Sequence, residues 1–303
     1  MKFYIIASII DSPTGGGNQF LRNLRNYFKE NDMYSRYNEA DVIIYNGHQF
    51  INDVQICKRL SKDVIFIHRL DGLQKLYNHS GDIRQDQAID ATKYADGIVF
   101  QAKWAKENFE KFGFKPDKPN VIIPNSVDRN LFKPSDRQRK QDKTKILCTS
   151  WSSNDNKGFK WYKFLDSALD FEKYEFHFIG NKPDWFESDN IICHSPMTTQ
   201  EISEQMRGFD IFLTATKHEC CSNSLLEALS SNLPVIALDS GGNPELVKDG
   251  GELFHDERTL LEKIDLVAKN IDSYRKNISI LNMNDVGKMY VDFAKSLREK
   301  NEA

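Results

Sequence analysis

The chain has 303 residues, of which 40% are hydrophobic and 12% aromatic, and its formal net charge is −3. This length fits one large domain or two modest ones, and the apolar content excludes global disorder. A slightly negative charge argues against a general nucleic-acid-binding protein, which normally carries a strong basic excess. The five cysteines are an odd number without a Cys-x-x-Cys pair, so they indicate neither a disulfide framework nor a zinc site.

The first ten residues are predicted to contain a β-strand, at residues 2–8, rather than a secretory signal. They run directly into Asp11 and a glycine cluster, without the small-residue cleavage site that a signal peptide needs. No apolar run approaches the length that spans a bilayer. We therefore expect a protein of the reducing cytoplasm, with peripheral membrane contact left open.

A glycine-rich turn of Gly15, Gly16 and Gly17 follows this strand and leads into a helix. Glycines at such a place allow backbone N–H groups to approach an anion closely, although a flexible turn before an amphipathic helix has the same composition. The dinucleotide fingerprint Gly-x-Gly-x-x-Gly fails at its last position, where Phe20 stands.

The exposed side of this first helix carries Arg22, Arg25 and Lys29. Such charges usually form a solvated face. Contact with a membrane or with an acidic acceptor is the alternative.

Two further strands are predicted at residues 42–45 and 64–68, with a helix at residues 52–60 between them. The second strand ends in a polar group that contains His68 and Asp71. Because α/β proteins place ligand-binding groups at the carboxyl ends of buried strands, both residues are candidates for a site. A plain turn at Asp71 and a hydrogen-bonded packing role for His68 are the alternatives.

Helices and strands then alternate as far as residue 123, and a polar stretch at residues 135–145 is the most linker-like part of the chain. We place a domain boundary there. The prediction is a first domain at residues 1–135, a second at residues 136–284, and a terminal helix at about residues 285–300 that packs back on the first.

The second domain is predicted to restart with a strand at residues 146–149, after which a polar loop leads to Lys157 at a helix start. A cation there opposes the helix dipole unless an anion lies near. A solvated lysine is one interpretation of Lys157, and the anion-binding interpretation comes from the resemblance to a known family described below.

The most informative stretch is residues 211–229, which reads as a buried strand, a polar loop and a helix. Glu219 lies in the loop and Glu227 in the first turns of the helix, and strand–loop–helix units of this kind bind ligands in open α/β sheets. The pattern from Ser224 to Glu227 also fits a capping box, so Glu227 has a structural alternative. Beside His218, the pair Cys220 and Cys221 lacks further ligands at workable spacing and is interpreted as loop residues rather than a metal site.

The order of pieces in this half resembles the retaining glycosyltransferases of family 4. Their signature is a glutamate, seven residues and a second glutamate, here Glu219 to Glu227, followed by Leu233–Ala237 and Gly241–Val247. The resemblance implies an α/β GT-B fold of two Rossmann-like domains with a cleft between them. It implies a retaining, hexosyltransferase-like enzyme that moves a sugar from a nucleotide-sugar donor to a hydroxyl acceptor.

The resemblance also implies roles for residues. Glu219 would hold the hydroxyls of the donor sugar, with His68 and Asp71 near the reacting sugar, and Glu227 would hold the ribose. The remaining donor-binding candidates are Gly15, Gly16, Gly17, Lys157, Ser222, Asn223 and Ser224. An arginine that the family often carries shortly after the strand at 146–149 is absent, and the chain has no Asp-x-Asp motif, so neither metal nor cofactor is expected.

Two alternatives stay open at this stage. One is a phosphorylase or epimerase with the same two-domain architecture. The other is a catalytically silent binding partner in a glycan-assembly complex, which the missing arginine and the short first domain favour and the retained glutamates do not. The sequence names neither the base, the sugar, the acceptor nor the oligomeric state.

Overall fold

The computed structural model of the protein describes residues 1–9, 16–61, 63–135 and 142–302. Within these residues the chain forms two compact units. The first contains residues 1–9, 16–61, 63–126 and 281–302, and the second contains residues 127–135 and 142–280. The sequence placed the boundary after residue 135, whereas the first unit ends at Ser126.

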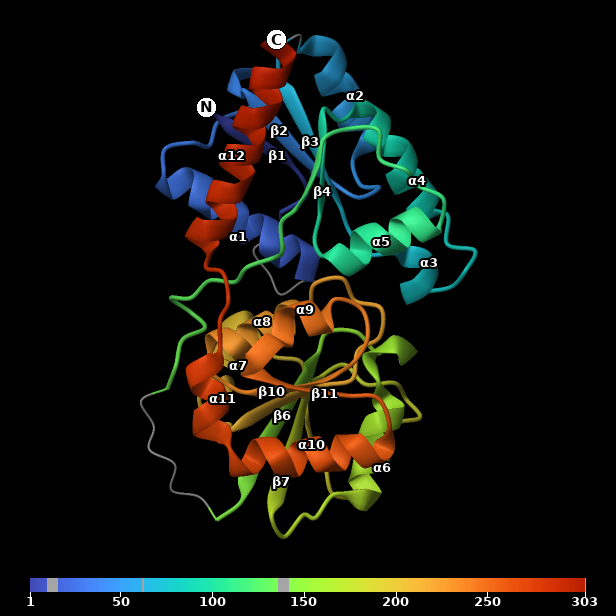
Figure 1. The fold of residues 1–303 in the computed structure, drawn as a ribbon, viewed down its shortest axis with the longest axis vertical. Coiled ribbons are helices and arrows are strands. Elements are labelled where there is room, and N and C mark those ends of the chain that lie inside the picture. The colour runs from blue at the N-terminus through green and yellow to red at the C-terminus, as the bar shows by residue number, and fades with distance from the viewer. Residues whose placement is uncertain (10–15, 62, 136–141, 303) are drawn as a thin grey trace. The chain divides into compact units, whose positions relative to one another are not determined.

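The first unit is built on five parallel strands in the order β1-β2-β3-β4-β5 (Figure 1). The strands are β1 (Phe3–Ile6), β2 (Val42–Asn46), β3 (Ile65–Leu70), β4 (Gly97–Phe100) and β5 (Asn120–Ile122). The helices are α1 (Gly16–Glu30), α2 (Ile51–Leu60), α3 (Gln74–Tyr77), α4 (Arg84–Ala91), α5 (Lys103–Lys111) and α12 (Met283–Glu302), with short 3-10 helices at Tyr37–Glu39 and Thr92–Tyr94.

Alternate residues of β2 enter two different cores. Val42 and Ile44 pack with α1 and α12, whereas Ile43 and Tyr45 pack with Val54 of α2. Every residue of β2 is buried, as in other parallel strands whose two faces are both covered by helices.

At β1, the edge strand of this sheet, the chain changes the side on which it adds the next segment, through one isolated bridge. After α1, Tyr34 forms a parallel bridge with Phe3, and the Phe3 N–H donates to the Met33 carbonyl at 2.7 Å. The chain therefore returns beside β1 on one side and then crosses to β2 on the other. Open α/β sheets bind ligands at the carboxyl end of the strand where such a reversal occurs.

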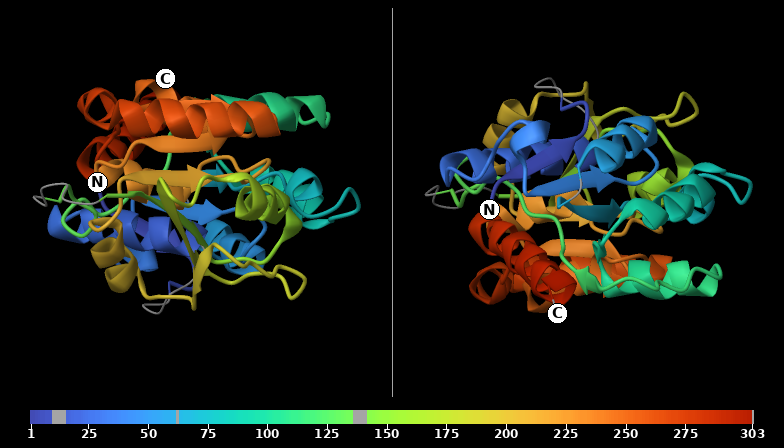
Figure 2. Two further views of the ribbon diagram at one scale, coloured as in Figure 1. Left: turned by 90° about the horizontal axis from the view of Figure 1, so that it is seen from below. Right: turned by 90° about the horizontal axis from the view of Figure 1, so that it is seen from above.

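The last helix, α12, belongs to the first unit, where it packs on α1 and β3 (Figures 1 and 2). Its buried face consists of Val286, Tyr290, Phe293, Ala294 and Leu297. The sequence-based expectation was a terminal helix at about residues 285–300 against this part of the chain.

The second unit is built on six parallel strands in the order β11-β10-β9-β6-β7-β8. The strands are β6 (Thr144–Ser150), β7 (Tyr174–Gly180), β8 (Ile192–His194), β9 (Ile211–Thr214), β10 (Val235–Leu238) and β11 (Gly251–Phe254). The helices are α6 (Phe159–Ala168), α7 (Thr199–Met206), α8 (Asn223–Ser230), α9 (Asn243–Val247), α10 (Glu257–Lys269) and α11 (Ile271–Asn277), with short 3-10 helices at Asp155–Lys157 and Lys248–Gly250.

Both faces of this second sheet are covered by helices (Figure 2). Phe159 of α6 and Leu260 of α10 share one core, and Leu225 of α8 and Met206 of α7 share the other. The sheet starts with β6 in its centre, extends to β8 on one side and then restarts with β9 on the other. The reversal therefore falls between β6 and β9.

Two helix starts differ from, or decide between, the sequence-based expectations. The sequence predicts Thr198 or Thr199 as the cap of α7, and the structure has Thr198, whose side chain accepts from the Glu201 N–H in a capping box. The asparagine before Pro244 predicts Asn243 as the N-cap of α9, but this prediction is wrong, because the N-cap is Gly242. Asn243 is the first residue of the helix, and its side-chain amide donates to the Thr216 and Leu238 carbonyls.

Among the helices of the described residues, none combines the length and the apolar character that crossing a membrane requires.

Candidate active site

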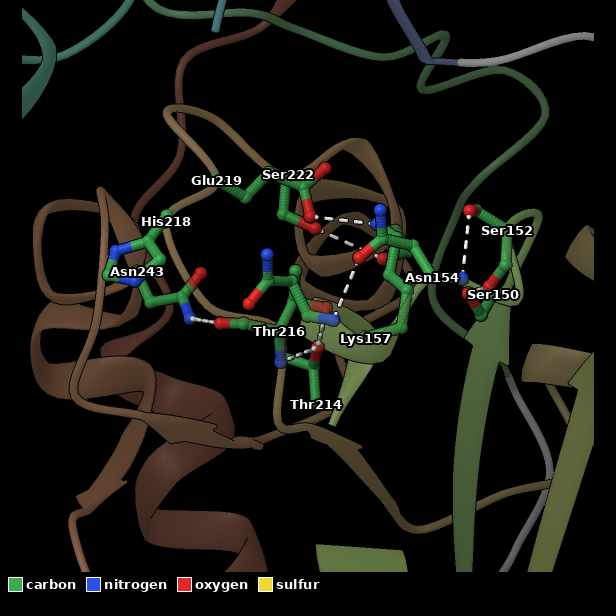
Figure 3. A network of polar contacts seen from close by, with 12 residues as sticks. Ser150, Ser152, Asn154, Lys157, Thr214, Thr216, His218, Glu219, Ser222 and Asn243 are labelled. Atoms are coloured by element: carbon green, nitrogen blue, oxygen red, sulfur yellow. Dashed lines mark hydrogen bonds and ion pairs between the residues drawn. The ribbon is translucent and has the colours of Figure 1, made fainter. Parts of the chain in front are cut away.

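The strongest candidate site lies at the reversal between β6 and β9, where the loops that follow the two strands meet. Lys157 ends a short 3-10 helix after β6, and Glu219 lies in the loop after β9. The Lys157 Nζ lies 3.0 Å from the Glu219 Oε2, with side chains only 16% and 26% exposed (Figure 3). The anion that a lysine at this helix start needs is therefore present, and it is one of the two predicted glutamates.

Backbone contacts between the two loops fix this pair. The Lys217 N–H donates to the Asn156 carbonyl at 2.7 Å. Gly158, which follows Lys157, has a φ of +86°, and a Cβ there would overlap the backbone of Ala215. Glycine therefore meets two demands at this position, positive φ and close approach of the two loops.

The loop after β10 supports Glu219 from the other side. The Gly242 N–H donates to the Glu219 carbonyl at 2.8 Å, and Gly241 has a φ of +65° with no room for a Cβ against Glu219. The His218 N–H donates to the Ser240 hydroxyl at 3.2 Å. The second glycine group of the sequence thus serves to hold the backbone of Glu219.

His218 itself stands in the left-handed region, with a φ of +57°. A non-glycine residue there is strained and is found more often at functional sites than elsewhere. Burial and the neighbouring Lys217 lower the pKa of His218, so its imidazole is neutral at pH 7.

The start of α8 brings the remaining predicted residues of this unit together. Ser222 is the N-cap, and the Ser222 and Ser224 hydroxyls lie 3.1 Å apart. Asn223 and Glu227 are buried, at 7% and 6% exposure. The capping-box alternative for Glu227 is not what the structure has, since Ser224 is inside the helix and the helix begins at Asn223.

The loop after β6 carries no arginine but is ordered by its own side chains. The Ser150 hydroxyl donates to the Ser152 carbonyl at 2.7 Å, and the Asn154 side chain accepts from the Asn156 N–H at 2.8 Å (Figure 3). The residue at the family's arginine position is a serine or Trp151, and Trp151 is 49% exposed. Lys157 is thus the cation that this loop supplies.

A second candidate site lies within the first unit, at the carboxyl ends of its strands. Asp71, directly after β3, accepts from the Asn46 side chain at 3.0 Å and from the Gln101 side chain at 2.9 Å. Burial raises the pKa of Asp71, but Arg69 and these hydrogen bonds outweigh it, and the net pKa is below the ordinary value. Asp71 is therefore ionised at neutral pH.

Side chains that were not among the predicted site residues hold Asp71, although Arg69 belongs to the polar group that ends the strand in the sequence. Arg69 is fully buried; it donates to the Asn46 side chain and, at 2.6 Å, to Asn125, and its guanidinium lies 3.8 Å from Asp71. The residues of this network lie at the ends of four different strands or just after them: Asn46, Arg69, Gln101 and Asn125. A polar residue at the end of an otherwise apolar strand was the signal available for Asn46 and Gln101.

His68 lies in the interior of β3 with no exposed surface. Its Nε2 donates to the Gly47 carbonyl at 2.8 Å, and its ring stacks on Tyr45 with centroids 4.3 Å apart. Burial lowers its pKa to about 4. Of the two roles that the sequence left open, the structure has the hydrogen-bonded packing residue, and no atom of His68 is available to a ligand.

Of the predicted glycines, Gly15 lies outside the described residues, whereas Gly16 and Gly17 form the first turn of α1. A Cβ at Gly17 would lie 3.3 Å from an Asp71 carboxylate oxygen. The glycine turn and Asp71, which are far apart in the sequence, are thus neighbours at one edge of the sheet.

Cys220 and Cys221 are buried, as expected for loop residues of β9 and α8. Within the described part of the chain, no group of three or more His, Cys, Asp or Glu side chains is arranged to hold a metal ion.

Comparison with known proteins agrees with this geometry. Residues 143–270 match the model of the family described as glycosyl transferases group 1. Alr3699/HepE of Anabaena, solved with UDP, superposes with a TM-score of 0.75 at 15% identity, over 98% of this chain and 100% of that one. The fold is GT-B.

Other structures share this GT-B architecture at similar distance. Sucrose-phosphate synthase of Thermosynechococcus elongatus gives a TM-score of 0.63 at 12% identity, over 96% of this chain and 79% of that one. A glycosyltransferase of Rickettsia africae gives 0.63 at 14% identity, over 95% and 84%. No curated protein matches the chain.

The α/β GT-B fold predicted from the sequence is confirmed by these superpositions. The family match covers the GT-B unit that holds Lys157, Glu219 and Glu227.

Proposed function

We propose that the protein is a retaining glycosyltransferase that transfers a sugar from a nucleotide-diphosphate donor to a hydroxyl acceptor. The observation that carries the proposal is the Lys157–Glu219 pair, with N and O atoms 3.0 Å apart, at the strand reversal of the unit that matches the group 1 family. A cation at this place suits the diphosphate of a nucleotide sugar, and a carboxylate suits the hydroxyls of its sugar.

The pair also provides a way to exchange partners when the donor binds. Without a donor, the Glu219 carboxylate neutralises the Lys157 ammonium. A diphosphate would replace Glu219 as the partner of Lys157, and this exchange would leave Glu219 free to accept hydrogen bonds from the sugar. As the glycosidic bond breaks, the charge on the leaving diphosphate grows, and a fixed cation stabilises that charge without reorganising.

The start of α8 is suited to the rest of the donor. Its backbone N–H groups and the Ser222 and Ser224 hydroxyls supply donors at a helix N-terminus, where anions bind favourably. Glu227, buried in the same helix, is proposed to accept from the ribose hydroxyls.

In the first unit we propose that Asp71 accepts a hydrogen bond from a substrate hydroxyl. Its lowered pKa keeps it ionised, and its bonds to Asn46 and Gln101 fix its orientation. We propose that no metal ion takes part, because side chains and backbone N–H groups supply the positive charge.

The two glutamates allow a direct test. Glu227→Ala should weaken binding of the nucleotide diphosphate itself, whereas Glu219→Gln should leave that binding nearly intact and lower turnover of the nucleotide sugar. Binding is measured by calorimetry and by thermal shift, in which a ligand stabilises by RT ln(1 + [L]/Kd). UDP is the first nucleotide to test, because Alr3699/HepE was solved with it.

A matched control is Glu262→Ala, an exposed glutamate of α10 that should change neither quantity. The proposal is contradicted if both site variants lose the same thermal stability and show no selective defect in nucleotide binding or turnover. Both glutamates would then serve only to stabilise the fold.

A further inference from the structure

The first unit contains a cavity that the proposed chemistry does not use. It has a volume of about 530 Å3 and lies between α2 and the end of α4 with the 3-10 helix that follows. We call it the α2/α4 groove. Its volume falls in the range of small-molecule sites, and its lining includes none of Asp71, Gly16 and Gly17.

The wall of the groove breaks the local rules of helix construction at Phe50. Phe50 is the N-cap of α2, a position that favours Ser, Thr, Asp or Asn, and its side chain makes no capping bond. Its φ is +55°, which is strained for an aromatic residue, and the residue is 39% exposed. Local rules broken together at a cavity wall are typical of functional positions.

The rest of the lining supplies hydrogen-bonding groups that are not used by the fold. The amides of Asn52, Gln55 and Gln87 line the groove, and none of the three makes a side-chain hydrogen bond to another described residue. Each amide presents both a donor and an acceptor, which is what neighbouring hydroxyl groups of a sugar require. Phe50 and Tyr94 add aromatic surface for the apolar face of a sugar ring.

The charge of the groove decides against an anionic ligand. Its ionised side chains are the Asp53 and Asp90 carboxylates and the Lys93 ammonium, which lies 5.2 Å from the centroid of the Tyr94 ring. His48 also lines the groove, and its pKa is lowered by burial and by Arg84, against the opposing effect of Asp71 and Asp82. The net charge is therefore negative, and phosphate groups are disfavoured.

We propose that the α2/α4 groove binds a neutral saccharide. The further statement that this saccharide is part of the acceptor rests on the glycosyltransferase function proposed above. Saccharide binding in the groove does not depend on that function.

The test measures saccharide binding to the full chain by saturation-transfer NMR. The probes are glucose, galactose, N-acetylglucosamine, maltose, lactose and cellobiose, with glucose 6-phosphate and spermidine as the charged comparisons. Gln87→Ala removes one free amide, and Phe50→Gly removes the ring while leaving a residue that accepts positive φ. Arg59→Ala, an exposed residue of α2 outside the groove, is the matched control.

At least one neutral sugar should bind, and each groove variant should weaken it by about tenfold, the size of one lost hydrogen bond or ring contact, with no change in Arg59→Ala. Thermal shift by UDP is measured in the same variants and should be unchanged. This readout separates the two proposals. Failure to bind UDP, with sugar binding intact, would contradict the proposed donor site but not saccharide binding in the groove. The groove proposal is wrong if no neutral sugar binds, if glucose 6-phosphate or spermidine binds instead, or if the groove variants bind sugar like Arg59→Ala.

Discussion

At the scale of single residues, the site depends on two opposite charges, on Lys157 and Glu219, that the fold holds 3.0 Å apart and only partly exposed. Lys157 is the cation that its loop supplies, and we propose that it binds the donor diphosphate. Ser150, Trp151 and Ser152 occupy the region where the family that the sequence resembles often has an arginine. Replacing a fixed charge of this kind typically costs on the order of a hundredfold in rate.

Lys157→Ala should therefore lower turnover by about a hundredfold, and Lys157→Arg should restore only part of it, because a planar guanidinium does not reproduce an ammonium point charge. Turnover should persist in excess EDTA. Lys160→Ala, an exposed lysine of α6, is the control. Normal turnover in Lys157→Ala, or activity that EDTA abolishes and manganese restores, would contradict this account.

His68 should make the protein sensitive to acid. Burial lowers its pKa from the ordinary 6.5 to about 4, against the opposing hydrogen bond to Gly47. Between these values the unfolded chain binds a proton that the folded chain does not, so the free energy of unfolding falls as pH falls from 6.5 towards 4. The full contribution is present above pH 6.5.

From pH 7 to pH 5 this linkage removes about 2 kcal/mol. His68→Gln, whose amide can still donate to the Gly47 carbonyl, should lose less stability over this range than the wild type, as measured by urea unfolding at both pH values. His255→Gln, at an exposed position, should behave like the wild type. If His68→Gln and the wild type lose the same free energy of unfolding between pH 7 and pH 5, groups other than His68 determine the acid sensitivity.

At the scale of elements, α12 completes the first unit because two glycines let helices and sheet approach. A Cβ on Gly97 of β4 would lie 2.7 Å from atoms of Phe293 and Leu297, and one on Gly287 would overlap the ring of Tyr27 in α1. The glycines are therefore packing residues, although glycine is unfavourable in regular elements.

Gly287→Ala should lower the free energy of unfolding by about 1–2 kcal/mol, because overpacking against Tyr27 costs more than the gain in helix propensity. Urea unfolding followed by circular dichroism measures this change. Lys288→Ala, exposed on the same helix, should be near neutral. A more stable Gly287→Ala variant would mean that Tyr27 moves aside without loss.

At the scale of the whole molecule, the two units differ in how the chain builds them. Among the described residues, those of the second unit all lie between residues 127 and 280, whereas the first unit also needs the segment after residue 280. The apolar face of α12, which includes Tyr290 and Phe293, is buried in the core of the first unit.

A fragment of residues 127–280 should therefore fold by itself and bind the same nucleotide as the full chain, as followed by circular dichroism and calorimetry. A chain that stops at residue 280 should lose the cooperative unfolding of the first unit, because it leaves the α12 side of the α1 core open to water. An unfolded fragment, or an undisturbed first unit without α12, would contradict this division.

Much of this architecture could be predicted because it is local in the sequence. Buried strands, helices of regular apolar spacing and glycine turns follow from patterns of a few residues. Lys157, Glu219 and Glu227 lie next to such patterns, at the end of a strand or the start of a helix. The patterns alone left each of them a structural alternative, and the resemblance to a glycosyltransferase family singled them out.

What only the tertiary structure decided is where distant residues meet. Nothing local shows that Arg69 bonds to Asn125 or that Gly241 makes room for Glu219, because those contacts join segments that the strand order brings together. Burial also decided between the two roles of His68. The sequence shows a histidine near the end of a strand, but the strand continues to Leu70 and His68 is fully buried within it. The sequence by itself determined which elements form, through short-range preferences, and the strand order determined which distant side chains come together.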